Sequence, residues 1–298
     1  MTVRVQAPVR IDFGGAWTDV GIYANEHGGA VFNATIDQYA LGTFEVRQRG
    51  EGVEAREGLS VNYGFDLPSG SGLGTSAALN VVWLALIGGG IREGRERGEI
   101  AEQAYRIEEV LGNLGGKQDQ WASALGGFNL LRFSKDGVET QSISLSPETL
   151  EALQSRSVLV YTGTPRLSGR IHESVWGAYQ SGRPETVAAL HRLKEIALTM
   201  PGKLNAGDVD GFAALLAENW TCQKALYDSV TNPQIERLFT IAREAGAVGG
   251  KACGAGGGGC LYFISSEGKR DSLAAALATA GAREIPFRFE FDGLTVKG

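Results

Sequence analysis

The chain has 298 residues and a mass of 31.6 kDa, which allows one large domain or two ordinary ones, and two is the better expectation. Its 43% hydrophobic and 21% charged residues are typical of a globular protein with a substantial core. No apolar run approaches the roughly 18 residues that a membrane span needs, and a net charge of −6 without a Lys/Arg run argues against a nucleic-acid partner.

The residue pattern predicts strands at both ends of the chain and mainly helices between them. The segments 3–13 and 30–47 are rich in β-branched and aromatic residues, which favours strands. The other expected elements, in chain order, are helices at 76–88, 98–111 and 118–125, a strand at 128–133, a polar Ser-rich turn region from 140, a strand at 157–163, two or three long helices within 170–245, a strand at 260–265, a helix at 270–281 and strands at 285–297. This order indicates an α+β protein with two domains, residues 1–155 and 156–298.

Glycine is the one anomaly of the composition. The chain has 43 glycines, about twice the usual share of roughly 7%. They cluster between the periodic segments, where they indicate tight turns or a close approach of backbone to a ligand. We therefore expect a protein that binds something small.

The loop "PSGSGLGTSAALN" at 68–80 is the strongest single candidate for that binding site. Gly72, Gly74 and Ala77 fit a dinucleotide-binding fingerprint, and Glu93 lies about 20 residues on, but no hydrophobic second strand leads to it. A Walker A loop is excluded because no lysine occurs between 51 and 100.

A third interpretation needs no lysine. Free N–H groups and the dipole at the start of the following helix favour an anion such as phosphate. The hydroxyls of Thr75 and Ser76 could bind phosphate or a metal ion, or could cap the helix. From this stretch alone, a plain structural turn with Ser76 as the cap fits equally well.

Four segments in order resemble the GHMP small-molecule kinases. "APVRIDFGGAWTD" at 7–19, the loop at 68–80 and "KACGAGGGGC" at 251–260 look like the first, second and third motifs of that family. The segment 111–133, which contains "GGKQDQ", is similar to the catalytic segment of the sugar 1-kinase branch with the heptose 7-phosphate kinases and L-fucokinases. The resemblance implies an N-terminal domain with a left-handed β-α-β crossover, a ferredoxin-like C-terminal domain, and ATP bound between the two.

The resemblance also implies the residues of phosphoryl transfer. Asp119 matches the catalytic aspartate, which would orient the acceptor hydroxyl and take its proton. Lys117 and Arg10 would supply positive charge near the moving phosphoryl group. The structural alternatives are a helix N-cap for Asp119 and an ordinary surface lysine for Lys117.

The second and third motifs would hold ATP. The implied phosphate-binding residues are Gly70, Ser71, Gly72, Leu73, Gly74, Thr75, Ser76, Gly256 and Gly257. The glycines of the third motif are expected to follow a helix and to let backbone approach the phosphate loop, with Cys253 and Cys260 as small packing residues.

Glu108 is the implied magnesium ligand, together with Ser76. At 100° per residue, Glu108 borders the apolar stripe of its helix, whereas Glu109 points to solvent. A carboxylate at such a border is poorly solvated unless something pairs with it, and Mg²⁺ with triphosphate oxygens would serve. A salt bridge to a neighbouring arginine is the structural alternative.

The end of the first motif would hold the acceptor sugar. Asp19 can accept two sugar hydroxyls, and the face of Trp17 can cover the apolar side of a pyranose, with Thr18 beside them. Trp17 could equally be a core residue. Arg166, in a segment similar to both kinase groups, is expected near the substrate or its phosphate.

We therefore expect a cytoplasmic kinase that uses ATP and Mg²⁺ to phosphorylate a sugar at its anomeric hydroxyl, as a monomer or homodimer without nucleic-acid or membrane partners. The absence of a secretory signal and of CxxC pairs fits a reducing cytoplasm. The alternatives are a kinase for a non-sugar alcohol such as mevalonate and a catalytically silent sensor of sugar and ATP. The signals for heptose 7-phosphate and L-fucose conflict, and no catalytic role is assigned to the three histidines, 27, 172 and 191.

Overall fold

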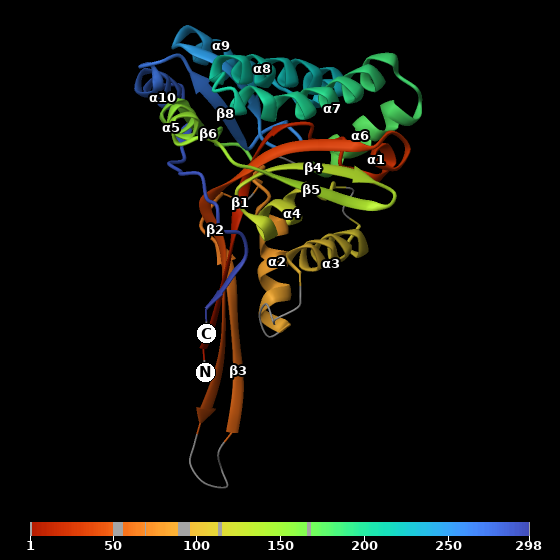
Figure 1. Cartoon of the computed structure of the whole chain (residues 1–298), viewed down its shortest axis with the longest axis vertical. Helices are drawn as coiled ribbons and strands as arrows, with labels where there is room; N and C mark the ends of the chain where they lie inside the picture. Colours follow the sequence, from red (N-terminus) through yellow and green to blue (C-terminus); the bar gives the residue numbers. More distant parts are fainter. Residues whose placement is uncertain are drawn as a thin grey trace.

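The computed structural model describes residues 2–49, 56–68, 70–88, 96–112, 115–165 and 168–297. Two antiparallel sheets and the helices around them form an α+β fold (Figure 1). The first sheet has the strand order β10-β1-β2-β4-β5, with β3 paired to β2, and the second has the order β7-β8-β6-β9. No helix in these described ranges is both long and apolar enough to cross a bilayer.

The strands are β1 (Thr2–Gly14), β2 (Gly29–Arg49), β3 (Arg56–Phe65), β4 (Phe128–Ser134), β5 (Gly137–Ile143), β6 (Ser157–Tyr161), β7 (Ala247–Ala252), β8 (Cys260–Ser265), β9 (Arg283–Glu284) and β10 (Thr295–Lys297). The helices are α1 (Gly21–His27), α2 (Thr75–Ile87), α3 (Arg97–Val110), α4 (Gln118–Leu125), α5 (Pro147–Arg156), α6 (Ser168–Gln180), α7 (Pro184–Asn205), α8 (Val209–Leu226), the 3₁₀ turn η2 (Asp228–Val230), α9 (Pro233–Glu244) and α10 (Arg270–Thr279).

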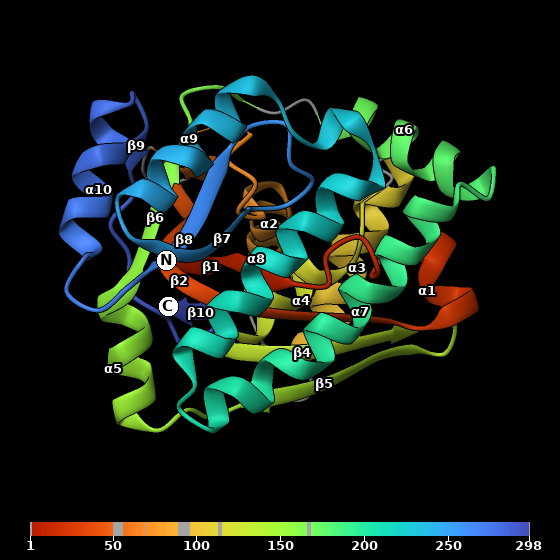
Figure 2. The same cartoon turned by 90° about the horizontal axis from the view of Figure 1, so that it is seen from above.

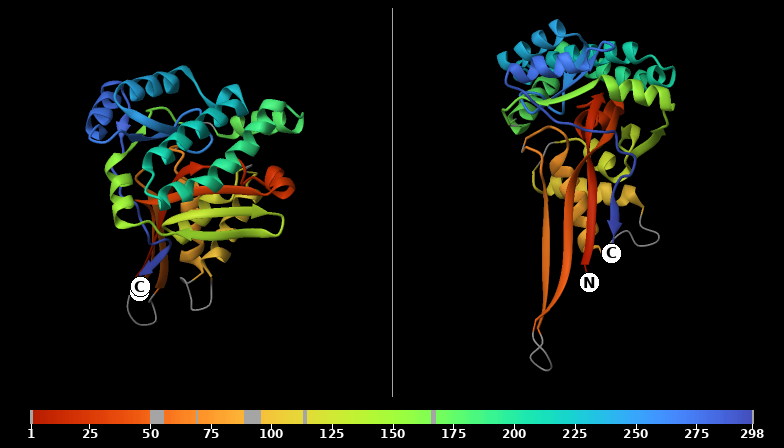
Figure 3. Two further views of the ribbon diagram at one scale, coloured as in Figure 1. Left: turned by 45° about the horizontal axis from the view of Figure 1, so that its top comes forward. Right: turned by 90° about the vertical axis from the view of Figure 1, so that its left-hand side faces the viewer.

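The first sheet is covered on both faces. Helices α2 and α4 pack against β1 and β2 on one face, and α7 and α8 contact the same strands from the other (Figure 2). Beyond this layer, β2 and β3 continue as a long hairpin that projects from the rest of the molecule (Figure 3).

Phe13 on β1 marks the junction of the two sheets. Its ring lies 5.2 Å from that of Phe212 on α8 and 5.4 Å from that of Tyr262 on β8. One hydrophobic cluster therefore contains buried residues of both sheets. Because a close-packed interior has low compressibility, this shared core fixes the two sheets relative to each other.

The first half of the chain follows the sequence pattern closely. The strands expected at 3–13, 30–47 and 128–133 and the helices expected at 76–88, 98–111 and 118–125 are all confirmed, within two residues at each end. The short helix α1 and the strands β3 and β7 lie outside every segment for which an element was expected.

The Ser-rich region after residue 140 was wrongly predicted as a turn region. Strand β5 exposes most of its side chains, so it lacks the apolar alternation that marks a strand. Helix α5 follows, with Pro147 in its first turn and with the Thr149 N–H donating to the Ser146 hydroxyl at 3.2 Å. The serine is thus a helix cap in this sequence.

Two predictions for the second half also need correction. The region 170–245 holds the four helices α6 to α9, where two or three were expected. Of the expected strands in 285–297, only β10 is a ladder strand, and 285–294 is an extended crossover held by single backbone bonds such as Glu290 N–H to Thr35 O at 2.9 Å. Because β10 pairs with β1, the C-terminal end returns to the first sheet, and the boundary between 155 and 156 stays a prediction.

Candidate active site

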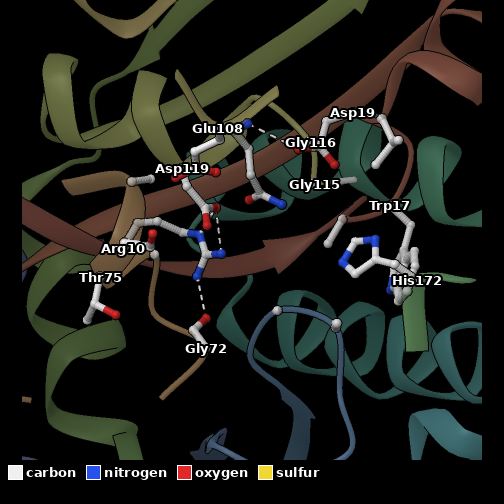
Figure 4. A pocket seen from close by; sticks show the side chains of 18 of the residues that line it. Arg10, Trp17, Asp19, Gly72, Thr75, Glu108, Gly115, Gly116, Asp119 and His172 are labelled. Atoms are coloured by element: carbon white, nitrogen blue, oxygen red, sulfur yellow. Dashed lines mark hydrogen bonds and ion pairs between the residues drawn. The ribbon is translucent and has the colours of Figure 1, made fainter. Parts of the chain in front are cut away.

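A cavity of about 580 Å³ lies between the first sheet, the helices α2, α3 and α4, the helix α6 and the loop after β7. Its lining brings together all four segments that resemble the kinase motifs (Figure 4). The residues that matter most here are Arg10, Trp17 and Asp19 from the first motif, Gly70, Gly72, Gly74, Thr75 and Ser76 from the second, Glu108, Gly116, Gln118 and Asp119 from the catalytic region, and Gly254 and Ala255 from the third.

The second motif forms a loop that ends at the first turn of α2. Gly70, Gly72 and Gly74 have φ angles of 70°, 82° and 78°, a region that favours glycine. Gly74 is the N-cap of α2, and no side chain caps the helix. The interpretation of Ser76 as the cap is therefore wrong, and the first N–H groups of α2 remain available at the cavity.

The third motif supports this loop from behind. The Cys260 N–H donates to Ser71 O at 2.7 Å, and a Cβ on Gly259 would lie 2.6 Å from the same oxygen. This close approach of backbone confirms the expectation for the third motif. The motif nevertheless connects the strands β7 and β8 and does not follow a helix, since β7 was missed in the sequence.

The glycines of the third motif lie at two different places, the cavity and the turn η2. Gly254 and Ala255 line the cavity. Gly256 and Gly257, predicted at the phosphates, instead pack on η2, where the Gly257 N–H donates to Val230 O at 2.8 Å. In the second motif, likewise, the buried Ser71 and Leu73 shape the loop and are absent from the cavity lining.

Arg10 joins the first motif to Asp119. Its Nε donates to Asp119 Oδ1 at 2.8 Å, its second terminal nitrogen lies 2.6 Å from the same oxygen, and the other donates to Gly72 O at 2.7 Å. Burial acts to lower the pKa of Arg10, but the charges of Asp119 and then Asp12 outweigh it and raise this pKa above its usual value. Arg10 is therefore a permanent cation that joins the glycine loop of the second motif to Asp119.

Asp119 lies in the first turn of α4 without capping that helix. Its carboxylate faces the glycine loop of the second motif, because a Cβ on Gly74 would lie 3.2 Å from its Oδ2. About a quarter of the side chain is exposed, at 24%. The N-cap alternative is thus wrong, and the carboxylate is held by Arg10 at the mouth of the loop.

Glu108 lies on α3, at the half-buried border that the helical periodicity predicts, while Glu109 is exposed. Asn80 Nδ2 donates to its Oε1 at 3.0 Å, and no arginine of the described residues forms an ion pair with it. Burial, followed by the charge of Asp119, raises the pKa of Glu108 from 4.5 to about 7. A nearby cation would favour its charged form.

Asp19 lies at the other end of the cavity. It accepts the Gln118 N–H at 3.1 Å, and a Cβ on Gly116 would lie 1.9 Å from its Oδ2, so the glycine is required there. The side chain is 4% exposed. Burial, opposed by the Gln118 bond and reinforced by the charge of Asp119, raises the pKa of Asp19 from 3.8 to about 7.

Trp17 is both a cavity residue and a core residue. Its ring lies 4.5 Å from that of His172 and 5.8 Å from that of Trp176, and the side chain is 3% exposed. Its φ of 83° is a strained conformation for a non-glycine residue, of the kind found at functional sites. Thr18 does not line the cavity, because its hydroxyl is held within hydrogen-bond distance of two backbone carbonyls, 2.8 Å from Gly15 O and 2.9 Å from Ala30 O.

Two further predicted site residues, Lys117 and Arg166, are not placed at the cavity. Lys117 does not line the cavity; its Nζ lies 2.8 Å from Glu102 Oε1 and 4.8 Å from the centre of the Tyr105 ring. Its predicted role near the phosphoryl group stays a prediction. Arg166 lies outside the described residues.

The sequence reasoning missed the contribution of α6. Gly169, His172 and Glu173 line the cavity beside Trp17. Tests for metal or triad spacing could not find His172, because its neighbour Trp17 lies 155 positions away in the chain. The one local signal was that α6 begins within the segment 161–169, which contains Arg166 and resembles the kinases.

Comparisons with known proteins agree with this architecture. The GHMP kinases N terminal domain model matches residues 38–127, and the GHMP kinases C terminal model matches 200–283. D-glycero-alpha-D-manno-heptose 7-phosphate kinase of Campylobacter jejuni is 30% identical, with 98% of each chain covered. The bifunctional fucokinase/GDP-fucose pyrophosphorylase of Arabidopsis thaliana is 25% identical over 90% of this chain and 30% of that protein.

A solved structure shows the same fold. The crystal structure of a D-glycero-D-manno-heptose 1-phosphate kinase from Bacteroides thetaiotaomicron superposes with a TM-score of 0.75, 24% identity and 99% of both chains covered. Fold and cavity together define a small-molecule kinase. The chain belongs to the GHMP kinase family.

Proposed function

We propose that this protein transfers the γ-phosphoryl group of ATP to the anomeric hydroxyl of a sugar or sugar phosphate of the heptose 7-phosphate or L-fucose kind. Family membership and the heptose and fucose kinases among the relatives support an ATP-dependent sugar kinase. The anomeric position rests on the segment 111–133, which resembles the sugar 1-kinase branch. A non-sugar alcohol is the weaker alternative, because a mevalonate kinase matches at 28% identity over 83% of this chain, against 30% over 98% for the heptose kinase.

The single observation that carries the proposal is the contact of three motifs at Arg10. This one cation binds both Asp119 and the carbonyl of Gly72 in the phosphate loop. A phosphate bound at the N-terminus of α2 would therefore lie beside both a carboxylate and a fixed positive charge. Phosphoryl transfer needs such positioning and electrostatic stabilisation more than covalent chemistry from the protein.

Asp119 would act on the acceptor hydroxyl. Its Oδ2, which Arg10 does not bind, can accept a hydrogen bond from that hydroxyl, orient it toward the γ-phosphorus and take its proton as the bond to phosphorus forms and the bond to ADP breaks. Arg10 keeps the carboxylate in one position and compensates its charge while phosphate approaches. Asp119 therefore orients the nucleophile, and Arg10 holds Asp119.

Glu108 and Ser76 suit a magnesium ion. Glu108 offers a carboxylate oxygen whose charge is poorly solvated, and Ser76 presents an exposed hydroxyl on the same side of the cavity. Mg²⁺ binds through one or two such oxygens and completes its shell with water and phosphate. When bound, it would neutralise charge on the triphosphate. Among the described residues, no group of three or more His, Cys, Asp or Glu side chains could hold a metal ion by itself.

Asp19 and Trp17 would hold the sugar. The buried carboxylate of Asp19 can accept hydrogen bonds from two sugar hydroxyls, which would take the place of water. The indole of Trp17 can cover an apolar face of the sugar ring. His172 and Glu173 close the same end of the cavity. Contacts from Arg166 to a substrate phosphate remain part of the proposal.

A coupled assay of ADP release with a panel of sugars, sugar phosphates and mevalonate tests the proposal. The wild-type protein should turn over a heptose 7-phosphate or an L-fucose-like sugar, and Asp119→Asn should lower kcat by about 10³-fold or more, because the nucleophile loses its base. Asp210→Asn is the matched control, since Asp210 also lies in the first turn of a helix and pairs with an arginine, outside the cavity.

Three outcomes would count against the proposal. Near-wild-type turnover by Asp119→Asn would remove the role given to that residue. Turnover of mevalonate alone would replace the sugar as acceptor. Tight binding of ATP and a sugar by calorimetry without ADP formation would indicate a silent sensor.

A further inference from the structure

A fully buried ion pair lies behind the candidate active site. Lys251 Nζ lies 2.5 Å from Asp12 Oδ2, and both side chains are 0% exposed. Burying two charges costs several kcal/mol per ion before their attraction offsets it, so such a pair is weak evidence for stability. The presence of the pair at this place therefore calls for an explanation other than stability.

The pair connects the two sheets, since Asp12 lies on β1 and Lys251 on β7. Lys251 on β7 donates to Asp12 Oδ2, and to the backbone carbonyls of Asp12 and Ala252 at 3.0 Å each. Asp12 lies two residues after Arg10 on β1, and Lys251 lies three residues before Gly254. The pair therefore touches the strands that carry both Arg10 and the third glycine motif.

These groups form a row of alternating charge: Asp119, Arg10, Asp12 and Lys251. The charge of Asp12 acts on Arg10, yet the side-chain bonds of Arg10 go to Asp119 and to the carbonyl of Gly72. Asp12 Oδ2 is bound by Lys251, and Asp12 Oδ1 has no hydrogen-bond partner among the described residues. Asp12 is thus a second carboxylate near Arg10, and Lys251 neutralises it.

We propose that Lys251 is a positioning residue for phosphoryl transfer: by neutralising Asp12, it leaves Arg10 to hold Asp119 and the phosphate loop. Without Lys251, the buried Asp12 carboxylate would compete with Asp119 for the guanidinium. Arg10 would turn toward Asp12, and Asp119 would lose its fixed orientation. This inference rests on the proposed kinase function.

The inference predicts an asymmetry between the two partners of the pair. Lys251→Met leaves an uncompensated carboxylate beside Arg10, and should lower kcat by about 10-fold or more while KM for ATP and sugar changes by less than about 3-fold. Asp12→Asn removes the competitor and should keep kcat within about 3-fold of wild type. The double variant Asp12→Asn/Lys251→Met should recover the same level, although the ion pair is gone.

A merely structural link between β1 and β7 predicts a different pattern. Both single variants would then lose activity together with thermal stability, and the double variant would be no better than Lys251→Met. Lys203→Met is the matched control, because it removes a lysine that lies 2.8 Å from Asp208 in a half-exposed ion pair far from the cavity. It should keep wild-type kcat.

The decisive experiment is steady-state kinetics of these four variants, with a crystal structure of Lys251→Met. The expected structure has Arg10 displaced from Gly72 O toward Asp12. Wild-type kcat in folded Lys251→Met, or loss of kcat in Asp12→Asn and in the double variant, would overturn the inference. If Lys251→Met fails to fold, the kinetics of Asp12→Asn and the double variant still decide. If wild type releases no ADP with any acceptor, the kinase proposal fails, and the position of Arg10 in the variant crystal tests this inference alone.

Discussion

Asp19→Asn should stabilise the protein at alkaline pH while it weakens sugar binding. Asp19 is 4% exposed, and burial is the main cause that raises its pKa from 3.8 to about 7. The folded protein therefore retains this proton at pH values where the unfolded chain has lost it. The stability that results is fully present below the unfolded pKa and is lost as pH rises through the folded pKa.

The size of the effect follows from that shift. The difference between 3.8 and about 7 is about 3 pKa units, which at about 1.4 kcal/mol per unit amounts to about 4 kcal/mol. About 3 kcal/mol of this loss falls between pH 5 and pH 8. Asparagine has the same shape, its amide oxygen can still accept the Gln118 N–H, and it does not ionise. The free energy of unfolding of the variant should therefore not include this decrease between pH 5 and pH 8.

The assay is urea unfolding of wild type and Asp19→Asn at pH 5 and pH 8, without ligands. The stability advantage of the variant should grow by about 3 kcal/mol between the two pH values, and kcat/KM for the sugar should fall, because the variant lacks the carboxylate that accepts its hydroxyls. An advantage that does not change with pH would refute the reasoning, since it would mean that Asp19 ionises as easily in the folded state as in the unfolded chain.

Two further predictions concern the nucleotide side of the cavity. Gly74→Ala should lower kcat strongly, because φ is 78° and the new Cβ would lie 3.2 Å from Asp119; Gly177→Ala, where a Cβ meets nothing within 4 Å, is the control and should keep wild-type activity in the ADP assay. Glu108→Gln keeps the shape and the bond from Asn80 but removes the charge, so the Mg²⁺ concentration for half-maximal rate at pH 8 should rise by about 10-fold or more. An unchanged Mg²⁺ titration would show that Glu108 is no ligand.

Some local features of this molecule are readable from its sequence, namely those with a clear apolar period or a glycine turn. The alternating glycines before a run of helix formers predicted a tight turn followed by α2, and the stripe on 98–111 placed Glu108 at a buried border, as the structure confirms. Phosphate binding by this loop stays a prediction. These features depend on residues within one or two turns of each other. Periodicity and turn chemistry act over that range.

The pairings between distant segments were not readable. Asp12 and Lys251 lie 239 positions apart, and Arg10 and Asp119 lie 109 apart, so no local pattern shows that they meet. The same limit explains Lys117, which turns to Glu102, and Gly256 and Gly257, which pack on η2. Only the resemblance of whole motifs brought the correct segments together, and it could not say which glycine of a motif faces the cavity.

The most direct test of the central claim is the structure of the product. The protein should be incubated with ATP, Mg²⁺ and the best acceptor of the panel, and the product examined by mass spectrometry and by phosphorus NMR. We predict a gain of one phosphoryl group, with the new phosphorus coupled to the anomeric proton of the sugar. A phosphorus coupled to the proton of another carbon would contradict the anomeric assignment, and ADP formation without a phosphorylated sugar would contradict the kinase itself.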